Sequence, residues 1–288
     1  MDRANVGTGR KCKARQCEAP DAYHADHSAL TSSMLKLFVG SLFNGQPSGG
    51  PRAYFESYIQ EQPAPPRNPG ILLTGNVFHT MCLEPHLLES RYRVIPTYAG
   101  ASQRVAEAWK AEQPPGLTFV AADQWGLAER MAESLRQRCG ELLDAPGYVE
   151  LALQGCDSET EICYKARLDK LLLRTTGPVL LELKSTEDLE HFPQVASALN
   201  YPLQMAHYAA AIEDWLGLCP TVFFAVAERD PPHRAELFDM PPTRLRQALR
   251  LRRRALRSLH RCLTTGVWPA AFDQVPSDPQ EDPSHESQ

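Results

Sequence analysis

The sequence of 288 residues lacks any long hydrophobic run. Its longest apolar stretches, such as TVFFAVA at 221–227, are far shorter than the roughly 20 residues that a membrane-spanning helix needs. The N-terminal segment 1–17 contains no apolar core of the kind found in signal peptides. We therefore expect a cytoplasmic protein that does not use the membrane as a partner.

The sequence also lacks a regular cysteine pattern. None of its eight cysteines forms a CxxC pair, and their spacing matches no disulfide framework (positions 12, 17, 82, 139, 156, 163, 219 and 262). In the reducing environment of the cytosol such residues are free thiols. We therefore expect all eight cysteines to be reduced.

An excess of positive charge is absent as well, because the net charge is −5. This excludes a protein that coats nucleic acid without specificity. The charge is nevertheless uneven: residues 243–262 contain eight arginines and no acid, and residues 273–288 contain five acids and three prolines. We expect a flexible basic arm over 1–20, a single domain over 21–272 and a disordered acidic tail over 273–288.

The hydrophobic pattern of this domain alternates between helical and strand periodicity. Helices are predicted over 26–43, 74–90 (with Thr74 as its N-cap), 120–145, 200–217 and 242–263. Strands are predicted over 148–154, 158–173, 178–186, 221–228 and 234–240. Strands with helices on both sides along the chain indicate an α/β fold, in which helices flank a central mixed sheet.

One strand of this sheet carries a carboxylate and an ammonium among leucines. Glu182 and Lys184 are two residues apart, so both side chains lie on the same face of the strand. Asp169 lies on the preceding strand, across a short TTGP turn, and can join them. We therefore expect the three groups to converge.

Two converging carboxylates repel each other unless a cation compensates them. Oxygen ligands with room for water suit Mg²⁺, and Mn²⁺ can substitute. Such an ion polarises a phosphate oxygen and acidifies a bound water. Beside it, Lys184 would have a depressed pKa and could orient or deprotonate the attacking water. The alternative is a strand-end lysine that pairs with Glu187 or Asp188.

Several further motifs occur in a definite order along the chain. They are GNVFHTMCLEP at 75–85, ARLDK at 166–170, LELKST at 181–186 and YPLQMAHY at 201–208. Together they resemble the exonuclease VIII (RecE-type) nuclease domain, which belongs to the RecB-like branch of the PD-(D/E)xK nuclease superfamily. The resemblance covers most of residues 22–272. It implies the restriction-endonuclease-like core of that superfamily.

The resemblance also implies roles for particular residues. The metal ligands would be His79, Asp169, Glu182 and the backbone carbonyl of Leu183. Lys184 would be the catalytic lysine, Gln204 would position the water or the scissile phosphate, and Tyr208 would contact the nucleic acid. The chain has Leu168 where the family has proline and Glu182 where it often has aspartate, and neither change removes a ligand.

Other residues are candidates for DNA contact. Ser185 and Thr186 could bond a phosphate oxygen, or they could be ordinary polar residues at the end of a strand. Four arginines of the 243–262 helix could contact the DNA backbone without sequence preference (Arg250, Arg253, Arg254 and Arg257). The alternative for these arginines is a solvated face that pairs with acids elsewhere.

The resemblance implies a processive 5′-to-3′ exonuclease that acts on the ends of linear double-stranded DNA. It would release mononucleotides with 5′-phosphates and leave a 3′ overhang for a single-strand annealing protein in recombination. Relatives act as ring-shaped homo-oligomers. An iron–sulfur cluster is not expected, because only Cys219 and Cys262 follow the QxxxY motif. An endonuclease, a single-strand exonuclease and an inactive DNA-binding module remain alternatives.

Overall fold

The computed structural model describes residues 13–16, 27–43, 46–62, 69–98 and 102–276. Its centre is a six-stranded sheet with the order β1 (Lys13–Gln16), β6 (Tyr148–Cys156), β7 (Cys163–Arg174), β8 (Gly177–Thr186), β9 (Thr221–Glu228) and β10 (Ala235–Met240). Adjacent strands are antiparallel except for β8 and β9, which are parallel. The prediction of an α/β fold with a mixed central sheet is confirmed.

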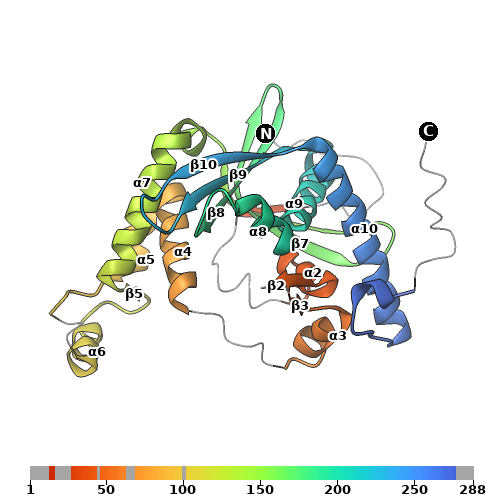
Figure 1. Cartoon of the computed structure of the whole chain (residues 1–288), viewed down its shortest axis with the longest axis horizontal. Coiled ribbons are helices and arrows are strands. Elements are labelled where there is room, and N and C mark those ends of the chain that lie inside the picture. The colour runs from red at the N-terminus through yellow and green to blue at the C-terminus, as the bar shows by residue number, and fades with distance from the viewer. Residues whose placement is uncertain (1–12, 17–26, 44–45, 63–68, 99–101, 277–288) are drawn as a thin grey trace.

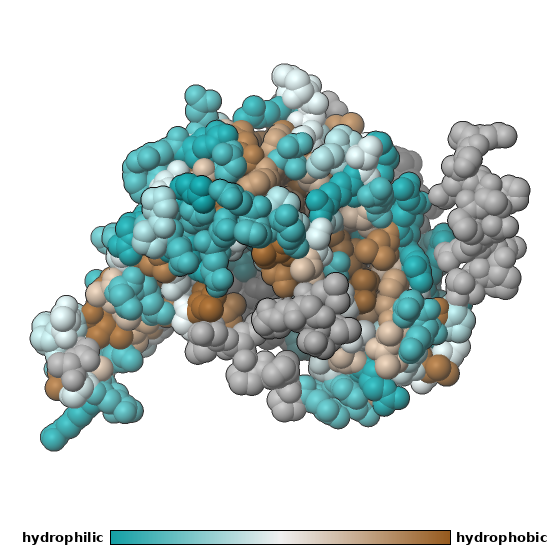
Figure 2. Space-filling view, in the orientation of Figure 1, coloured by the Kyte–Doolittle hydropathy of each residue, from teal (hydrophilic) through white to brown (hydrophobic). Residues whose placement is uncertain are grey.

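Helices cover both faces of this sheet (Figure 1). On one face, α4 (Pro69–Leu83) and α7 (Ala122–Asp144) pack against Leu181 and Leu183 of β8. On the other face lie α2 (Ser32–Val39), α8 (Phe192–Ala198) and α9 (Tyr201–Leu216), and α10 (Pro242–Thr265) packs on α9. Because both faces are covered, β8 and β9 consist mainly of apolar residues. Hydrophilic residues occupy much of the face that Figure 2 shows.

The parallel pairing of β8 and β9 requires a crossover connection, which α8 and α9 supply. Short elements complete the fold: β2 (Ser41–Phe43), β3 (Gln46–Ser48), α3 (Pro51–Tyr54), a π-helical turn (Phe55–Ile59), 3₁₀ turns (Pro85–Leu87 and Phe272–Gln274), α5 (Leu88–Arg91), β4 (Tyr92–Val94), α6 (Gln103–Ala111) and β5 (Thr118–Val120). In Figure 1, α6 projects away from the sheet. No helix in the described part of the chain is long and apolar enough to cross a membrane.

Several boundaries differ from the prediction. The helix expected over 74–90 begins at Pro69 and ends at Leu83. The Thr74 hydroxyl is inside this helix and donates to the Gly70 carbonyl at 3.0 Å, so it is not an N-cap. Lys13–Gln16 forms an edge strand within the expected flexible arm. Val275 is buried in the core, so the packed domain continues beyond residue 272.

The prediction of eight reduced cysteines is wrong for one pair. Cys156 and Cys163 lie directly opposite each other at the end of the β6–β7 hairpin and form a disulfide. Among the described residues, the other four cysteines are free (Cys82, Cys139, Cys219 and Cys262). Cys12 and Cys17 lie outside the described residues. The pairing depends on the register of two strands, which the spacing of cysteines in the sequence does not reveal.

Candidate active site

The three groups expected to converge do so on β7 and β8. The Lys184 ammonium lies 2.6 Å from Glu182 Oε1. The Leu183 backbone N–H donates to Asp169 Oδ2 at 2.7 Å. Glu182 and Asp169 are buried, whereas Lys184 is partly exposed. The alternative pairing of Lys184 with Glu187 or Asp188 is not observed, since Glu187 binds Arg229 and Asp188 binds His191.

Strand pairing is irregular at this point, and the irregularity opens the site. The β7–β8 ladder ends at Lys170 and Leu181, and the Asp169 carboxylate takes the place of the next backbone acceptor. On β6, Glu150 has a φ of 52°, which is uncommon for a residue with a side chain. Glu150 and Asp169 are opposite each other but form no ladder pair. Unusual backbone of this kind is frequently found at functional sites.

Glu150 is a site residue that the sequence analysis missed. Single ligand atoms of His79, Glu150 and Asp169 all lie within 4.8 Å of one another. His79 Nδ1 is 3.5 Å from Asp169 Oδ2, and Arg167 Nε is 2.5 Å from Glu150 Oε2. The strand register is the signal that indicates Glu150. When the 148–173 hairpin is aligned, Glu150 lies opposite Asp169.

The carboxylates of this site have raised pKa values. Burial raises the pKa of Glu182 to about 7, and the charge of Asp169 adds to this effect. Burial also raises the pKa of Glu150 to about 8, with a further contribution from Asp169. The pKa of Asp169 is raised by burial too. Ionising these carboxylates together is therefore unfavourable, and a bound cation would offset that cost.

Two basic residues respond differently to this environment. Burial lowers the pKa of His79 to about 4, so its imidazole is neutral near pH 7 and able to act as a ligand. Burial also lowers the pKa of Lys184, but the attraction of Glu182 and Asp169 outweighs it, and the pKa is raised overall. We expected a depressed pKa for Lys184 beside a metal. Without a metal, the protein raises this pKa.

The donor set fits a divalent cation. Glu182 Oε2 is buried and has no hydrogen-bond partner among the described residues. The grouped ligand atoms come from two carboxylates, Glu150 and Asp169, and the neutral imidazole of His79. The nearby basic side chains are Arg167, which pairs with Glu150, and Lys184, which pairs with Glu182. Such an oxygen-rich set suits Mg²⁺ or Mn²⁺. A hydrogen bond between the His79 imidazole and the Leu183 backbone also places that backbone beside this group.

Helix α9 contributes two polar side chains from one of its faces. Gln204 Nε2 donates to Glu182 Oε1 at 2.8 Å and to the Tyr208 hydroxyl at 3.0 Å. Ser32 of α2 donates to the same hydroxyl at 3.4 Å. Gln204 and Tyr208 are four residues apart, so one helical turn aligns them. The predicted QxxxY pair is thus adjacent to the carboxylates.

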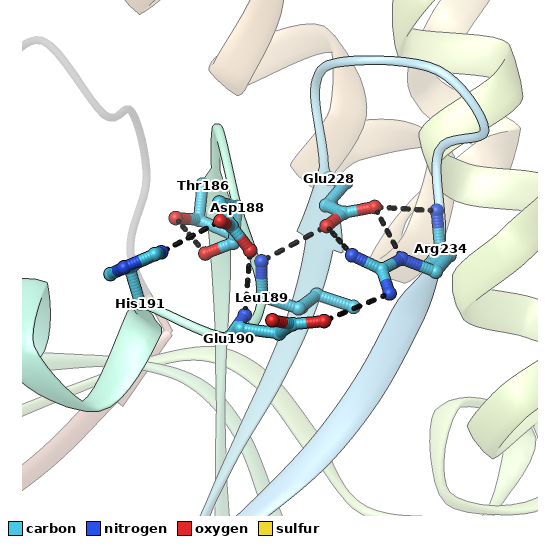
Figure 3. Close-up of polar contacts among 7 residues, drawn as sticks. All are labelled: Thr186, Asp188, Leu189, Glu190, His191, Glu228 and Arg234. Carbon is cyan, nitrogen blue, oxygen red and sulfur yellow. Dashed lines mark hydrogen bonds and ion pairs between the residues drawn. The ribbon is translucent and has the colours of Figure 1, made fainter.

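The end of β8 is held by a cluster of polar residues, which we call the strand-end cluster (Thr186, Asp188–His191, Glu228 and Arg234; Figure 3). Glu228 is buried and accepts from the Leu189 N–H at 3.0 Å. Arg234 donates to both Glu228 oxygens, at 2.7 and 3.0 Å. These bonds tie the loop after β8 to the β9–β10 hairpin. They thereby fix the start of the connection from β8 to α8 and α9.

The charged and polar groups line a cleft of about 510 Å³. Its walls are the N-terminus of α2, the outer side of α4, and the segment from α5 into β4. Each of the three walls contributes polar residues, and Glu150, Arg167, Asp169 and Glu182 line the same cleft. The cleft is the candidate substrate site because the candidate metal ligands His79, Glu150, Asp169 and Glu182 line it, whereas Lys184 does not line it and lies against Glu182.

Some predicted DNA-contact residues lie elsewhere. Neither Ser185 nor Thr186 lines the cleft, and the Thr186 hydroxyl donates to the Asp188 carbonyl at 3.1 Å. No described residue of α10 lines it either. Arg257 pairs with Glu159 at 2.7 Å, and the Arg254 guanidinium lies 4.8 Å from the Phe272 ring centroid.

The remaining arginines of α10 differ in burial. Arg250 and Arg253 are exposed. Arg252 is buried against the Tyr164 ring, 5.1 Å from its centroid. Contact of the four predicted arginines with DNA therefore stays a prediction.

Comparison with known proteins agrees with this geometry. A family model described as "PDDEXK-like domain of unknown function (DUF3799)" matches residues 32–276. A crystal structure titled "Putative exonuclease", from Eubacterium rectale, is similar with a TM-score of 0.56 and 12% sequence identity. The similarity covers 84% of this chain and 86% of that one, and it concerns the fold. Among curated proteins, no sequence matches the chain.

Proposed function

Because the chain belongs to the family of PDDEXK-like domains, we propose that it is a metal-dependent deoxyribonuclease that hydrolyses DNA from the ends of linear duplexes. The observation that carries this proposal is that Asp169 and Glu182 line one cleft with His79 and Glu150, while Lys184 lies 2.6 Å from Glu182. A degenerate, non-catalytic relative would be expected to have lost one of these groups. This argues against the inactive DNA-binding module.

Each side chain has a defined part in the proposed reaction. His79, Glu150, Asp169 and Glu182 would hold Mg²⁺ or Mn²⁺, together with the Leu183 carbonyl. When bound, the ion would supply polarisation of the scissile phosphate and acidification of a water. Lys184 would orient the attacking water, or transfer its proton, from a position 2.6 Å from Glu182.

Gln204 and Tyr208 would contact the substrate beside these groups. Gln204 is fixed against Glu182, so it is placed to position the water or the scissile phosphate. Tyr208 lines the cleft and would contact the nucleic acid. The products would be 5′-phosphomonoesters, and the 5′-to-3′ direction follows from the RecE-type resemblance. A ring-shaped homo-oligomer, a single-strand annealing partner and a cytoplasmic location also stay predictions.

Degradation of linear duplex, closed-circular and single-stranded DNA tests the proposal directly. Each substrate is incubated with Mg²⁺, Mn²⁺ or EDTA, and Glu182→Ala serves as the blank. We expect metal-dependent loss of the linear duplex alone. Nicking of closed circles would favour a RecB-like endonuclease, and digestion confined to single strands would favour a single-strand exonuclease. DNA binding without any cleavage would favour the inactive module.

A further inference from the structure

Helix α2 brings a lysine to the active site from the N-terminal part of the chain. Lys36 Nζ lies 3.4 Å from Gln204 Oε1, although 168 residues separate them in the sequence. The same ammonium is 5.2 Å from the ring centroid of Tyr201, at the first turn of α9. Lys36 is half-buried, so these contacts occur within the packed structure. Lys36 is not one of the motif residues named from the sequence.

The two ends of the Gln204 amide are used in different ways. Its nitrogen donates to Glu182 and Tyr208, while its oxygen faces Lys36. An ammonium can only donate and an ionised carboxylate can only accept. A rotated amide would therefore direct its oxygen at the Glu182 carboxylate and its N–H groups at the Lys36 ammonium. Lys36 and Glu182 together determine the orientation of this amide.

Tyr201 provides a second connection between Lys36 and the reacting groups. Its ring centroid is 4.9 Å from Lys184 Nζ and 5.2 Å from Lys36 Nζ. The electron-rich face of an aromatic ring attracts cations at such distances. The ring thus contacts both ammonium groups and restricts where each can lie. A displacement of Lys36 would be transmitted to Lys184 through the ring and to Glu182 through Gln204.

We propose that Lys36 is a positioning residue of the active site, which acts through the Gln204 amide and the Tyr201 ring. It holds Gln204 in the orientation that donates to Glu182. This inference rests on the proposed nuclease function. It assigns to α2 a role in arranging the reacting groups, in addition to its place in the core.

A double-mutant cycle tests whether Lys36 acts through Gln204. The four proteins are the wild type, Lys36→Met, Gln204→Met and the double variant, with cleavage of linear duplex followed at saturating Mn²⁺. We expect Lys36→Met to lower kcat about tenfold with KM within about twofold, and to cost less than about twofold in the Gln204→Met background. Lys36→Arg, which retains a donor, should keep kcat within about threefold of the wild type.

Lys110→Met is the matched control, because Lys110 also lies over an aromatic ring, but that of Phe119 and not that of Tyr201. It should leave kcat and KM unchanged. The thermal midpoints of all variants are compared, so that unfolding is not mistaken for lost positioning.

Three results would overturn the inference: an equal loss of kcat in both backgrounds, a rise in KM alone, or no loss at all. A rise in KM alone would instead indicate direct binding of DNA by Lys36. If the wild type cleaves no DNA, the proposed function fails first, and the inference fails with it. The two kinds of failure are distinguishable, because failure of the proposed function appears already in the wild type, whereas failure of the inference appears only in the variants.

Discussion

At the scale of single residues, the site depends on an ammonium beside a buried carboxylate. Lys184 lies 2.6 Å from Glu182, and Glu182 Oε2 has no partner among the described residues. The two carboxylate oxygens of Glu182 therefore have separable roles. Oε1 binds Lys184 and Gln204, and Oε2 remains for a cation. This division explains why a buried strand accepts both charges.

Replacement of Lys184 tests its part in the chemistry. We expect Lys184→Ala to lower kcat about a thousandfold, the range typical of lost proton transfer or lost orientation of a nucleophile. DNA binding should be largely retained, since Lys184 is only partly exposed. Single-turnover cleavage and a DNA-binding isotherm measure the two quantities. Turnover at the wild-type rate would exclude Lys184 from the mechanism.

Glu150 tests the metal site itself. We expect Glu150→Gln to weaken Mn²⁺ binding about 10- to 100-fold, because it removes one charged ligand and keeps the shape of the side chain. Isothermal titration with Mn²⁺ measures this. Glu161→Gln is the control, since Glu161 also has a positive φ, of 57°, but is exposed outside the cleft. Equal affinities for both variants would show that Glu150 is not a ligand.

The raised carboxylate pKa values predict how metal binding depends on pH. Glu182 and Glu150 titrate at about 7 and about 8, above their usual range, so both bind protons at pH 6. A cation competes with these protons, and its affinity should rise from pH 6 to pH 8.5. His79, with a pKa of about 4, is neutral throughout this window and contributes nothing to the change. Mn²⁺ titrations across the window measure the slope, and a flat profile would contradict the assignment.

At the scale of elements, β8 and α9 must keep a fixed relation, because one carries Glu182 and Lys184 and the other carries Gln204. The strand-end cluster is the link that follows β8. Glu228 is its central member, since it bonds both the Leu189 backbone and the Arg234 guanidinium. Loss of Glu228 would leave the Leu189 N–H without this acceptor and Arg234 with Glu190 at 3.7 Å as its remaining described acidic partner.

We therefore expect Glu228→Ala to lower the free energy of unfolding by about 2 kcal/mol, because the buried Leu189 N–H loses its acceptor while the half-exposed Arg234 can be hydrated. Urea denaturation monitored by circular dichroism measures the change. The control is Glu190→Ala, because Glu190 is exposed and lies 3.7 Å from the same arginine. It should change stability by less than about 0.5 kcal/mol. Equal effects of the two variants would deny Glu228 its central role.

At the scale of the whole molecule, the charge is distributed unevenly. The net charge is −5, yet α10 carries eight arginines, and Arg250 and Arg253 are among those exposed outside the cleft. A duplex that enters the cleft would need positive charge beyond it, because a protein gains DNA affinity by neutralising phosphates. The predicted contact with α10 would extend the DNA path in this way.

The salt dependence of binding tests that path. We expect the double variant Arg250→Gln/Arg253→Gln to raise KM, to leave kcat unchanged, and to reduce the slope of log affinity against log salt by about 0.9 for each lost phosphate contact. DNA binding at several salt concentrations measures the slope. An unchanged slope would identify the arginines as a solvated face.

The core elements of the molecule were predictable from sequence because their periodicity is strong. The strands around Asp169 and Glu182, the helix with Gln204, and the arginine-rich helix all lie where the pattern indicates. The helix around His79 was placed less well, because Thr74 bonds within the helix instead of capping it. Short elements such as α6 carry too few residues for a reliable period.

Strand periodicity was enough to place the candidate reacting residues Glu182 and Lys184 on one face, since the two-residue repeat of a strand does so whatever surrounds it. The ordered motifs along the chain also indicated His79, Asp169, Gln204 and Tyr208, but other members of the site follow only from tertiary contacts. Glu150 joins Asp169 through strand register and a positive φ, and Lys36 reaches Gln204 across 168 residues. The Cys156–Cys163 bond likewise follows from hairpin register. Such contacts depend on which elements become neighbours on folding, and local periodicity does not indicate which elements those are.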